Sequence, residues 1–226
     1  MNKVLVIAPH ADDEVLGCGA TMFRHAELGD EVHVIVATNA SKGAPELFSE
    51  NSIDDVRKEA LDAHKILGVQ KTYFLDFPAP ALNAYPSFKI SIEISKILNE
   101  FKADTVYLPH PGDLHEDHNS IYRAALVSCR PQNGNSVKRI YCYETLSETE
   151  WAPMQGDHYF KPNHFVDVSS YFEAKLEAMK CFQSQLKAFP HSRSIEALEA
   201  LAKYRGSTVG AERAEAFEVE RQIVRN

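Results

Sequence analysis

Residues 3–8, Lys3-Val-Leu-Val-Ile-Ala8, form a short apolar run that is followed directly by Pro9-His10-Ala11-Asp12-Asp13-Glu14. A continuous run rich in β-branched residues is typical of a strand that is covered on both faces in a parallel sheet. A helical pattern then extends over about 13–28 and stops at Gly29-Asp30. This strand–acid–helix junction predicts the first unit of an α/β fold.

The same alternation continues along the chain. Further strands are expected at 32–37, 72–75, 105–108, 137–143 and 165–168. Helices are expected at about 53–67, 87–101, 119–129, 171–188 and 194–204. Successive β–α units require right-handed crossovers, and these produce a parallel sheet with helices on both faces. Because no Pro/Gly/Ser-rich linker divides the chain, we predict one domain over residues 1–226, a Rossmann-like three-layer α/β fold with a helical C-terminal extension.

Composition excludes several classes of partner. The 226 residues include 24 Lys and Arg against 32 Asp and Glu, for a net charge of −8. This balance argues against a nucleic-acid groove or an anionic membrane surface. No apolar stretch approaches the roughly 18 residues of a membrane span. The four cysteines are far apart and form no CxxC pair, which favours reduced thiols over disulfides or a thiolate zinc site. We expect a cytoplasmic protein without a membrane span or a nucleic-acid partner.

Two clusters of polar residues follow predicted strands. The first contains His10, Asp12 and Asp13, and the second is the stretch 110–119, His-Pro-Gly-Asp-Leu-His-Glu-Asp-His-Asn. Ligands of α/β sheets bind outside the carboxyl ends of the strands. Both clusters lie at that edge, so they converge if their strands are neighbours.

The residue types in these clusters favour a metal. Imidazole and carboxylate without thiolate suit zinc or, less specifically, iron, manganese or cobalt. Because Asp12 and Asp13 point in different directions, one can bind the metal while the other faces its water as a general base. In His115-x-x-His118, one ring can bind metal while the other faces the substrate. The acids 12–14 could instead be ordinary helix N-terminal acids, but the coincidence of two clusters favours the metal.

Together these motifs resemble the PIG-L/LmbE-like family of zinc-dependent deacetylases, which act on N-acetylglucosamine-type sugars. Residues 9–14 match the family's Ala/Pro-His-Pro-Asp-Asp-Glu motif, with Ala11 in place of the usual proline. Residues 113–118, Asp-Leu-His-Glu-Asp-His, match its His-x-Asp-His motif, which an acid precedes. Weaker agreement spans nearly the whole chain.

The resemblance implies a role for each motif residue. The ligands of Zn²⁺, or of another divalent transition metal, would be His10, Asp13 and His118. Asp12 would be the general base. His115, hydrogen-bonded to Asp117, would stabilise the oxyanion or protonate the leaving amine. The expected reaction is removal of an acetyl group from an N-acetylated amino sugar or sugar conjugate by a metal-activated water.

Other residues are assigned with alternatives left open. The resemblance makes Arg57 substrate-facing, although it could equally be a solvated arginine beside Asp54. His191, Arg193 and Arg205 would contact either the substrate or a neighbouring subunit of a homo-oligomer. His110 is expected to lie behind the metal ligands. The expected partner is a small N-acetyl sugar, free or linked to a nucleotide or lipid.

Three other functions compete with this interpretation. A metal-dependent amidase acting on a non-sugar N-acyl small molecule would use the same ligands with a different pocket. A metal-binding protein without catalysis would have no need of a spare base and a spare imidazole. A nucleotide-binding module is disfavoured because Gly17-Cys-Gly19 does not form a GxGxxG fingerprint.

Overall fold

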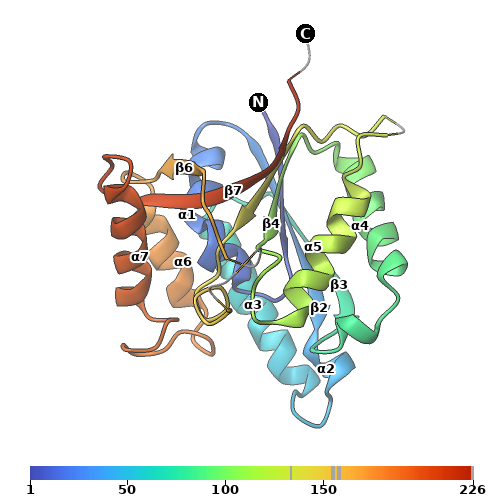
Figure 1. The fold of residues 1–226 in the computed structure, drawn as a ribbon. Coiled ribbons are helices and arrows are strands. Elements are labelled where there is room, and N and C mark those ends of the chain that lie inside the picture. The colour runs from blue at the N-terminus through green and yellow to red at the C-terminus, as the bar shows by residue number, and fades with distance from the viewer. Residues whose placement is uncertain (133, 154–155, 157–158, 225–226) are drawn as a thin grey trace.

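A seven-stranded sheet in the order β3-β2-β1-β4-β5-β7-β6 forms the centre of the fold (Figure 1). The computed structural model describes residues 1–132, 134–153, 156 and 159–224. Five strands run parallel: β1 (Lys3–Ala8), β2 (Glu31–Asn39), β3 (Lys71–Pro78), β4 (Thr105–Pro109) and β5 (Arg139–Tyr143). The antiparallel pairs are β5–β7 and β6–β7, in which β6 spans His164–Asp167 and β7 spans Ala214–Gln222.

Helices cover both faces of this sheet. One face carries α1 (Asp13–Glu27), α3 (Glu50–Ile66) and α6 (Phe172–Cys181), and α6 packs against both of the others. The other face carries α4 (Ser87–Phe101) and α5 (Glu116–Ser128), which pack against each other. The remaining helical segments are α2 (Ala40–Gly43), the 3₁₀ turn η1 (Leu82–Ala84) and α7 (Ile195–Ser207), which packs against β7.

Strand β1 shows why the molecule has three layers. Val4 and Val6 belong to the apolar core beneath α1 and α6, whereas Leu5 and Ile7 belong to the core beneath α4 and α5. All four side chains are fully buried. Since successive strand residues point to opposite faces, an uninterrupted apolar run is what a sheet covered on both sides requires. The expected three-layer α/β architecture is confirmed.

The C-terminal region differs from the expected helical extension. Strand β7 was not predicted, and it lies between β5 and β6, so that the sheet is mixed rather than wholly parallel. Its sequence, Ala-Glu-Ala-Phe-Glu-Val-Glu-Arg-Gln, has one β-branched residue, so pairing with two neighbours rather than intrinsic preference makes it a strand. Helix α6 ends at Cys181, well before the expected end at 188. Among the described residues, none of the helices has the length and apolarity to cross a membrane.

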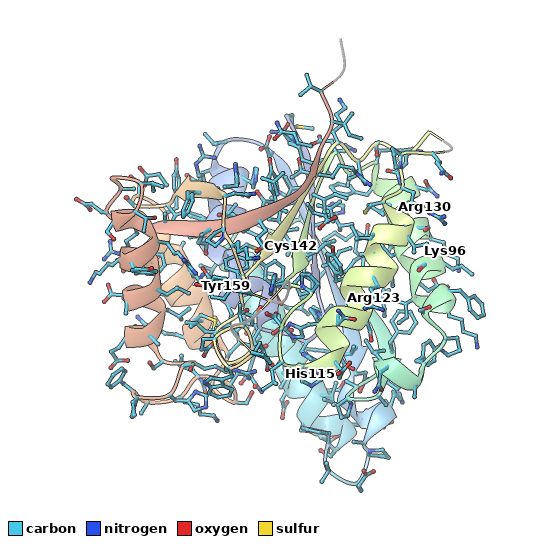
Figure 2. The ribbon with its side chains drawn as sticks, in the orientation of Figure 1. Lys96, His115, Arg123, Arg130, Cys142 and Tyr159 are labelled. Carbon is cyan, nitrogen blue, oxygen red and sulfur yellow. The ribbon has the colours of Figure 1, made fainter. Side chains whose placement is uncertain are left out.

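The topology brings the two polar clusters together. Strands β1 and β4 are direct neighbours and parallel, so the loops that follow them leave the sheet side by side. Figure 2 shows His115 at the start of α5, at the edge toward which the parallel strands run. The expected convergence at the carboxyl edge is therefore present in the fold.

Candidate active site

Asp13 lies at the centre of the polar cluster. Its Oδ2 atom accepts a hydrogen bond from the backbone N–H of His10 at 2.9 Å. The same oxygen is 3.2 Å from Nδ1 of His10 and 3.2 Å from Nε2 of His118. Asp13 and His118 are buried, whereas the His10 side chain is 28% exposed. Two imidazoles and one carboxylate thus meet at a site that is open on one side.

A carboxylate fixes the orientation of His118. Its Nδ1 atom is 2.8 Å from Oδ2 of Asp113, and Oδ1 of Asp113 accepts a hydrogen bond from the Thr149 hydroxyl at 2.5 Å. Because a carboxylate can only accept, Nδ1 of His118 carries the hydrogen. The lone pair of the neutral ring is then on Nε2, which faces Asp13. This is the usual arrangement behind a metal-binding histidine.

His10 is oriented in the same way by a different carboxylate. Its Nε2 atom is 3.2 Å from Oδ2 of Asp117, and Oδ1 of Asp117 accepts a hydrogen bond from the backbone N–H of Leu82 at 3.1 Å. Donation through Nε2 leaves the lone pair of His10 on Nδ1, which faces Asp13. Asp117 therefore contacts His10 most closely, rather than His115.

Three observations indicate that the cluster is suited to a divalent metal. The ligand atoms of His10, Asp13 and His118 lie within 4.8 Å of one another. Among the described residues, the buried atoms Oδ1 of Asp13 and Nε2 of His118 have no hydrogen-bond partner. The donors are nitrogen and oxygen, which suits zinc with a position left for water. In a second set, His10 with His115 and Asp117, the ligand atoms also lie within 4.8 Å of one another. In that set, however, Nδ1 of His115 and Oδ1 of Asp117 already accept hydrogen bonds.

Electrostatics at the cluster favour positive charge. Burial lowers the pKa of His10, but hydrogen bonds to Asp117 and Asp13 outweigh it and raise the pKa to about 9. Burial likewise lowers the pKa of His118, whereas the charge of Asp13 and the hydrogen bond to Asp113 raise it well above the usual value. Burial disfavours a charged Asp13, yet the two histidines hold its pKa well below the usual range. A site that stabilises cations in this way is suited to a metal ion.

Asp12 is held in an unusual backbone conformation. It has φ 121° and ψ −28°, a region that strains residues with a side chain. Its backbone N–H donates to Oε2 of Glu14 at 3.2 Å, and Oε1 of Glu14 is 2.9 Å from Nε2 of His64. Burial raises the pKa of Asp12 to about 8, against the opposing charge of Arg193, whose Nη1 atom is 3.2 Å from Oδ2 of Asp12.

His115 differs from expectation in how it is oriented. Its Nδ1 atom accepts a hydrogen bond from the backbone N–H of Asp117 at 3.2 Å, while the Asp117 carboxylate is 3.9 Å away. An accepting Nδ1 places the hydrogen of the neutral ring on Nε2. Burial and the charge of His10 lower the pKa of His115 to about 4. The ring is therefore a neutral hydrogen-bond donor beside His10, with 4.6 Å between ring centroids.

The remaining predicted residues lie outside the cluster. Arg57 donates to Asp76 at 2.5 Å and covers the Phe74 ring, so it pairs with Asp76 and not with Asp54, the neighbour given by the alternative to a substrate contact. Buried His110 is 3.3 Å from Glu218 of β7. His191 accepts a hydrogen bond from the backbone N–H of Arg193. Arg205 makes two hydrogen bonds to Glu144, at 2.8 and 2.6 Å, on the wall of a cavity of about 160 Å³.

The contacts of three residues of the site were not predicted from the sequence. Asp113 stands in the second motif, and its place before two histidines was a usable signal. Thr149 gives no such signal, because it reaches Asp113 from a loop 36 residues away. Arg193 was singled out only as a contact to substrate or subunit, whereas its guanidinium reaches Asp12 within the same chain.

Comparison with known proteins points to one family. Residues 5–129 match the family model PIG-L, described as GlcNAc-PI de-N-acetylase. A relative from Escherichia coli K12, "Uncharacterized deacetylase YaiS", is 33% identical over 80% of this chain and 90% of its own length. The diacetylchitobiose deacetylase of Thermococcus kodakarensis is 26% identical over 95% of this chain and 82% of its own. The crystal structure of the conserved protein TT1542 from Thermus thermophilus superposes with a TM-score of 0.79, at 26% identity over 100% of this chain and 98% of that one.

One relative has a different reaction. The 4-oxalmesaconate hydratase of Pseudomonas putida is 24% identical over 81% of this chain and 74% of its own length. The choice between reactions therefore depends on what the site can do to its substrate.

Proposed function

Since the chain belongs to the PIG-L family, we propose that it is a metal-dependent hydrolase that removes the acetyl group from an N-acetylated amino sugar or sugar conjugate. The observation that carries the proposal is the buried triad of His10, Asp13 and His118, with a second carboxylate, Asp12, adjacent to it. The deacetylase relatives support the reaction. Zn²⁺ is the proposed metal, because two imidazoles and one carboxylate form a known catalytic zinc set.

Asp12 is proposed as the base. When bound, the metal lowers the pKa of a water molecule and polarises the acyl carbonyl. Asp12 then accepts the proton as the water attacks, and it returns that proton to the nitrogen that leaves. A base is most effective when its pKa is near the working pH, and burial has brought the pKa of Asp12 to about 8.

His115 is proposed as the donor to the oxyanion. Negative charge develops on the carbonyl oxygen during attack, and a neutral imidazole N–H fixed toward it stabilises that charge. The hydrogen bond from the Asp117 backbone to Nδ1 leaves Nε2–H for this task. Of the two roles expected from the sequence, the geometry supports the oxyanion role over protonation of the amine.

Acetate release tests the proposal. Purified protein loaded with zinc is assayed against a panel of free N-acetylglucosamine, N-acetyl-oligosaccharides, and nucleotide- and lipid-linked N-acetyl sugars. We expect acetate and a free amine from at least one class, with activity lost after chelation and restored by zinc. Arg57 of α3, which pairs with Asp76 near the end of β3, is proposed to contact the sugar. R57Q should therefore raise KM. The proposal fails if no member of the panel releases acetate.

Hydration is the second candidate, because one relative is a hydratase. In that reaction the water adds across an electron-poor C=C bond and no amide is cleaved. 4-Oxalmesaconate, the compound named for that relative, is therefore included in the panel, with loss of its ultraviolet absorbance as the readout. Turnover of this compound without acetate release from any sugar would favour hydration. If acetate or another acid is released only from N-acyl compounds that are not sugars, the amidase alternative is favoured.

We also propose that residues 1–226 act as one domain and assemble as a homo-oligomer. The proposed contact lies near residues 191–205, where Tyr204 of α7 is 61% exposed. Light scattering should then give a multiple of 25.4 kDa. A stable monomer at assay concentration would remove the oligomer without affecting the reaction.

A further inference from the structure

Three consecutive carboxylates are buried at the junction of β1 and α1. Asp12, Asp13 and Glu14 have exposures of 2%, 1% and 0%. Such a concentration of negative charge requires compensation. Asp13 is compensated by the two metal-binding histidines, and Glu14 contacts His64 of α3. Asp12 needs a partner of its own.

Arg193 supplies that partner. Its Nη1 atom is 3.2 Å from Oδ2 of Asp12, as an ion pair, and Oδ2 of Asp12 accepts no hydrogen bond from the residues that the structure describes. Arg193 lies in the loop between α6 and α7, about 180 positions from Asp12 along the chain. The C-terminal half of the protein therefore reaches the first motif through one guanidinium.

The guanidinium is fixed by its own loop and by the loop that follows β5. Nε of Arg193 donates to the Ser147 hydroxyl at 2.7 Å, and Nη1 donates to Oε1 of Gln185 at 2.9 Å. Nη2 is 3.7 Å from Oε1 of Glu148. Since each nitrogen already has a partner within the chain, the group is poorly placed to bind a phosphate or a neighbouring subunit. It is well placed to restrain Asp12.

We propose that Arg193 is a positioning residue for Asp12, which it holds by one carboxylate oxygen so that the other is left to take the proton. This inference rests on the proposed function, because it assumes that Asp12 is the base. A guanidinium is suited to the task because its planar donors are held in a fixed arrangement. Losing it should misplace the base without removing the metal.

The test uses three variants of the full chain. R193Q removes the positive charge. R193K keeps a positive charge but lacks the planar set of N–H donors of the guanidinium. R139Q is the matched control, because Arg139 is also a partly exposed arginine paired with a carboxylate, Asp104 at 2.5 Å, at the opposite edge of the sheet. For each variant, kcat, KM, zinc content and thermal unfolding are measured on zinc-loaded protein.

We expect R193Q to lower kcat by up to about 100-fold, the cost of misplacing a reacting group by about 1 Å, with KM and zinc content unchanged. R193K should recover part of this loss. R139Q should lower stability and leave kcat unchanged. An unchanged kcat in R193Q would overturn the proposal, as would loss of zinc. A rise in KM alone would instead make Arg193 a substrate-binding residue.

A second readout is independent of turnover. In crystal structures of zinc-loaded wild type and R193Q, we expect the Asp12 carboxylate to be displaced or disordered in the variant while His10, Asp13 and His118 remain in place. An Asp12 side chain that is unchanged would refute positioning by Arg193, whatever the substrate. Failure of the wild type to hydrolyse any N-acetyl sugar would refute only the proposed function.

Discussion

At the scale of single residues, neighbouring carboxylates acquire different chemistry from their surroundings. Burial favours a raised pKa for both Asp13 and Asp12. The two imidazoles that contact Asp13 outweigh burial and lower its pKa, whereas burial raises the pKa of Asp12 to about 8. Adjacent titratable groups whose pKa values are separated in this way usually have separate roles. This difference agrees with the proposed division into one ligand, Asp13, and one base, Asp12.

Substituting each carboxylate by its amide should separate the two roles. D12N is nearly isosteric and cannot accept a proton, so it should keep zinc and lose roughly 10²–10⁴-fold in kcat, the usual contribution of a general base. D13N should lose zinc and recover some activity in excess metal. Zinc content and kcat are measured together on both variants. Zinc loss in D12N with retention in D13N would reverse the assignment.

Backbone strain at Asp12 can be measured by comparing two variants that both lack the carboxylate. Glycine adopts the observed φ of 121° without cost, whereas alanine does not. D12G should therefore be more stable than D12A by about 1–3 kcal/mol, the usual cost of such a conformation. Denaturant unfolding gives the difference. Equal stability would mean that no strain is stored at this position.

Asp113 should control metal affinity through His118. D113N removes the carboxylate that holds the ring, and loss of such a partner typically lowers metal affinity about 10–100-fold. Chelator competition measures the affinity. D55N is the control, because the Asp55 side chain is 72% exposed on α3 and remote from the cluster. If D113N binds zinc as tightly as D55N, the carboxylate does not orient the ligand.

At the scale of elements, helix α1 depends on residues that come late in the chain. The helix is kinked at Cys18, where φ is −143°. Glu215 of β7 accepts hydrogen bonds from the backbone N–H groups of Ala20 and Thr21, at 3.2 and 2.7 Å. Lys175 of α6 donates to the Leu16 carbonyl at 2.8 Å and pairs with Glu215 at 2.6 Å. A buried ion pair thus satisfies the polar groups that the kink exposes.

Breaking this ion pair should be costly, and removing both charges less so. K175M leaves a buried carboxylate and E215Q leaves a buried ammonium, so each should cost about 3–5 kcal/mol of unfolding free energy. The double variant K175M/E215Q should cost less than the sum, because neither charge is left unpaired. Denaturant unfolding of all four proteins gives the coupling. Additive losses would show that the pair is not coupled.

Elements and site differed in how far the sequence could predict them. Strand β1 was predictable because a strand buried on both faces must be apolar throughout. The proximity of His10, Asp13 and His118 was predictable because they stand in two compact motifs after neighbouring strands. Strand β7 was not, since Glu215 occupies a buried position that is made tolerable by Lys175, 40 residues away, and by the backbone N–H groups of Ala20 and Thr21. Arg193 was missed as a partner of Asp12 for the same reason. Contacts between distant segments leave no local pattern.

At the scale of the whole molecule, the metal should connect the two β–α junctions that carry its ligands. His10 and Asp13 follow β1, and His118 lies in α5 after β4. An ion bound by both junctions ties them together only in the folded state. Its binding free energy is therefore added to the stability of the native fold.

Chelation should lower the melting temperature. At a free zinc concentration about 1,000 times the Kd, the bound ion adds about 4 kcal/mol to the unfolding free energy. Melting curves with zinc and with chelator measure the effect. H118A should no longer respond to zinc, whereas H191A, which changes an exposed histidine outside the triad, should respond as the wild type does. An equal response in H118A would place the stabilising ion elsewhere.

The insertion of β7 between β5 and β6 has a consequence for synthesis on the ribosome. Strand β6 pairs only with β7 in the described sheet, so residues 164–167 must wait for residues 214–222 before they can join it. The five parallel strands can assemble while the nascent chain is still being extended, since domains begin to fold from the N-terminal side. The edge of β5 stays unpaired during that interval, which makes it the surface most exposed to chaperones or to aggregation.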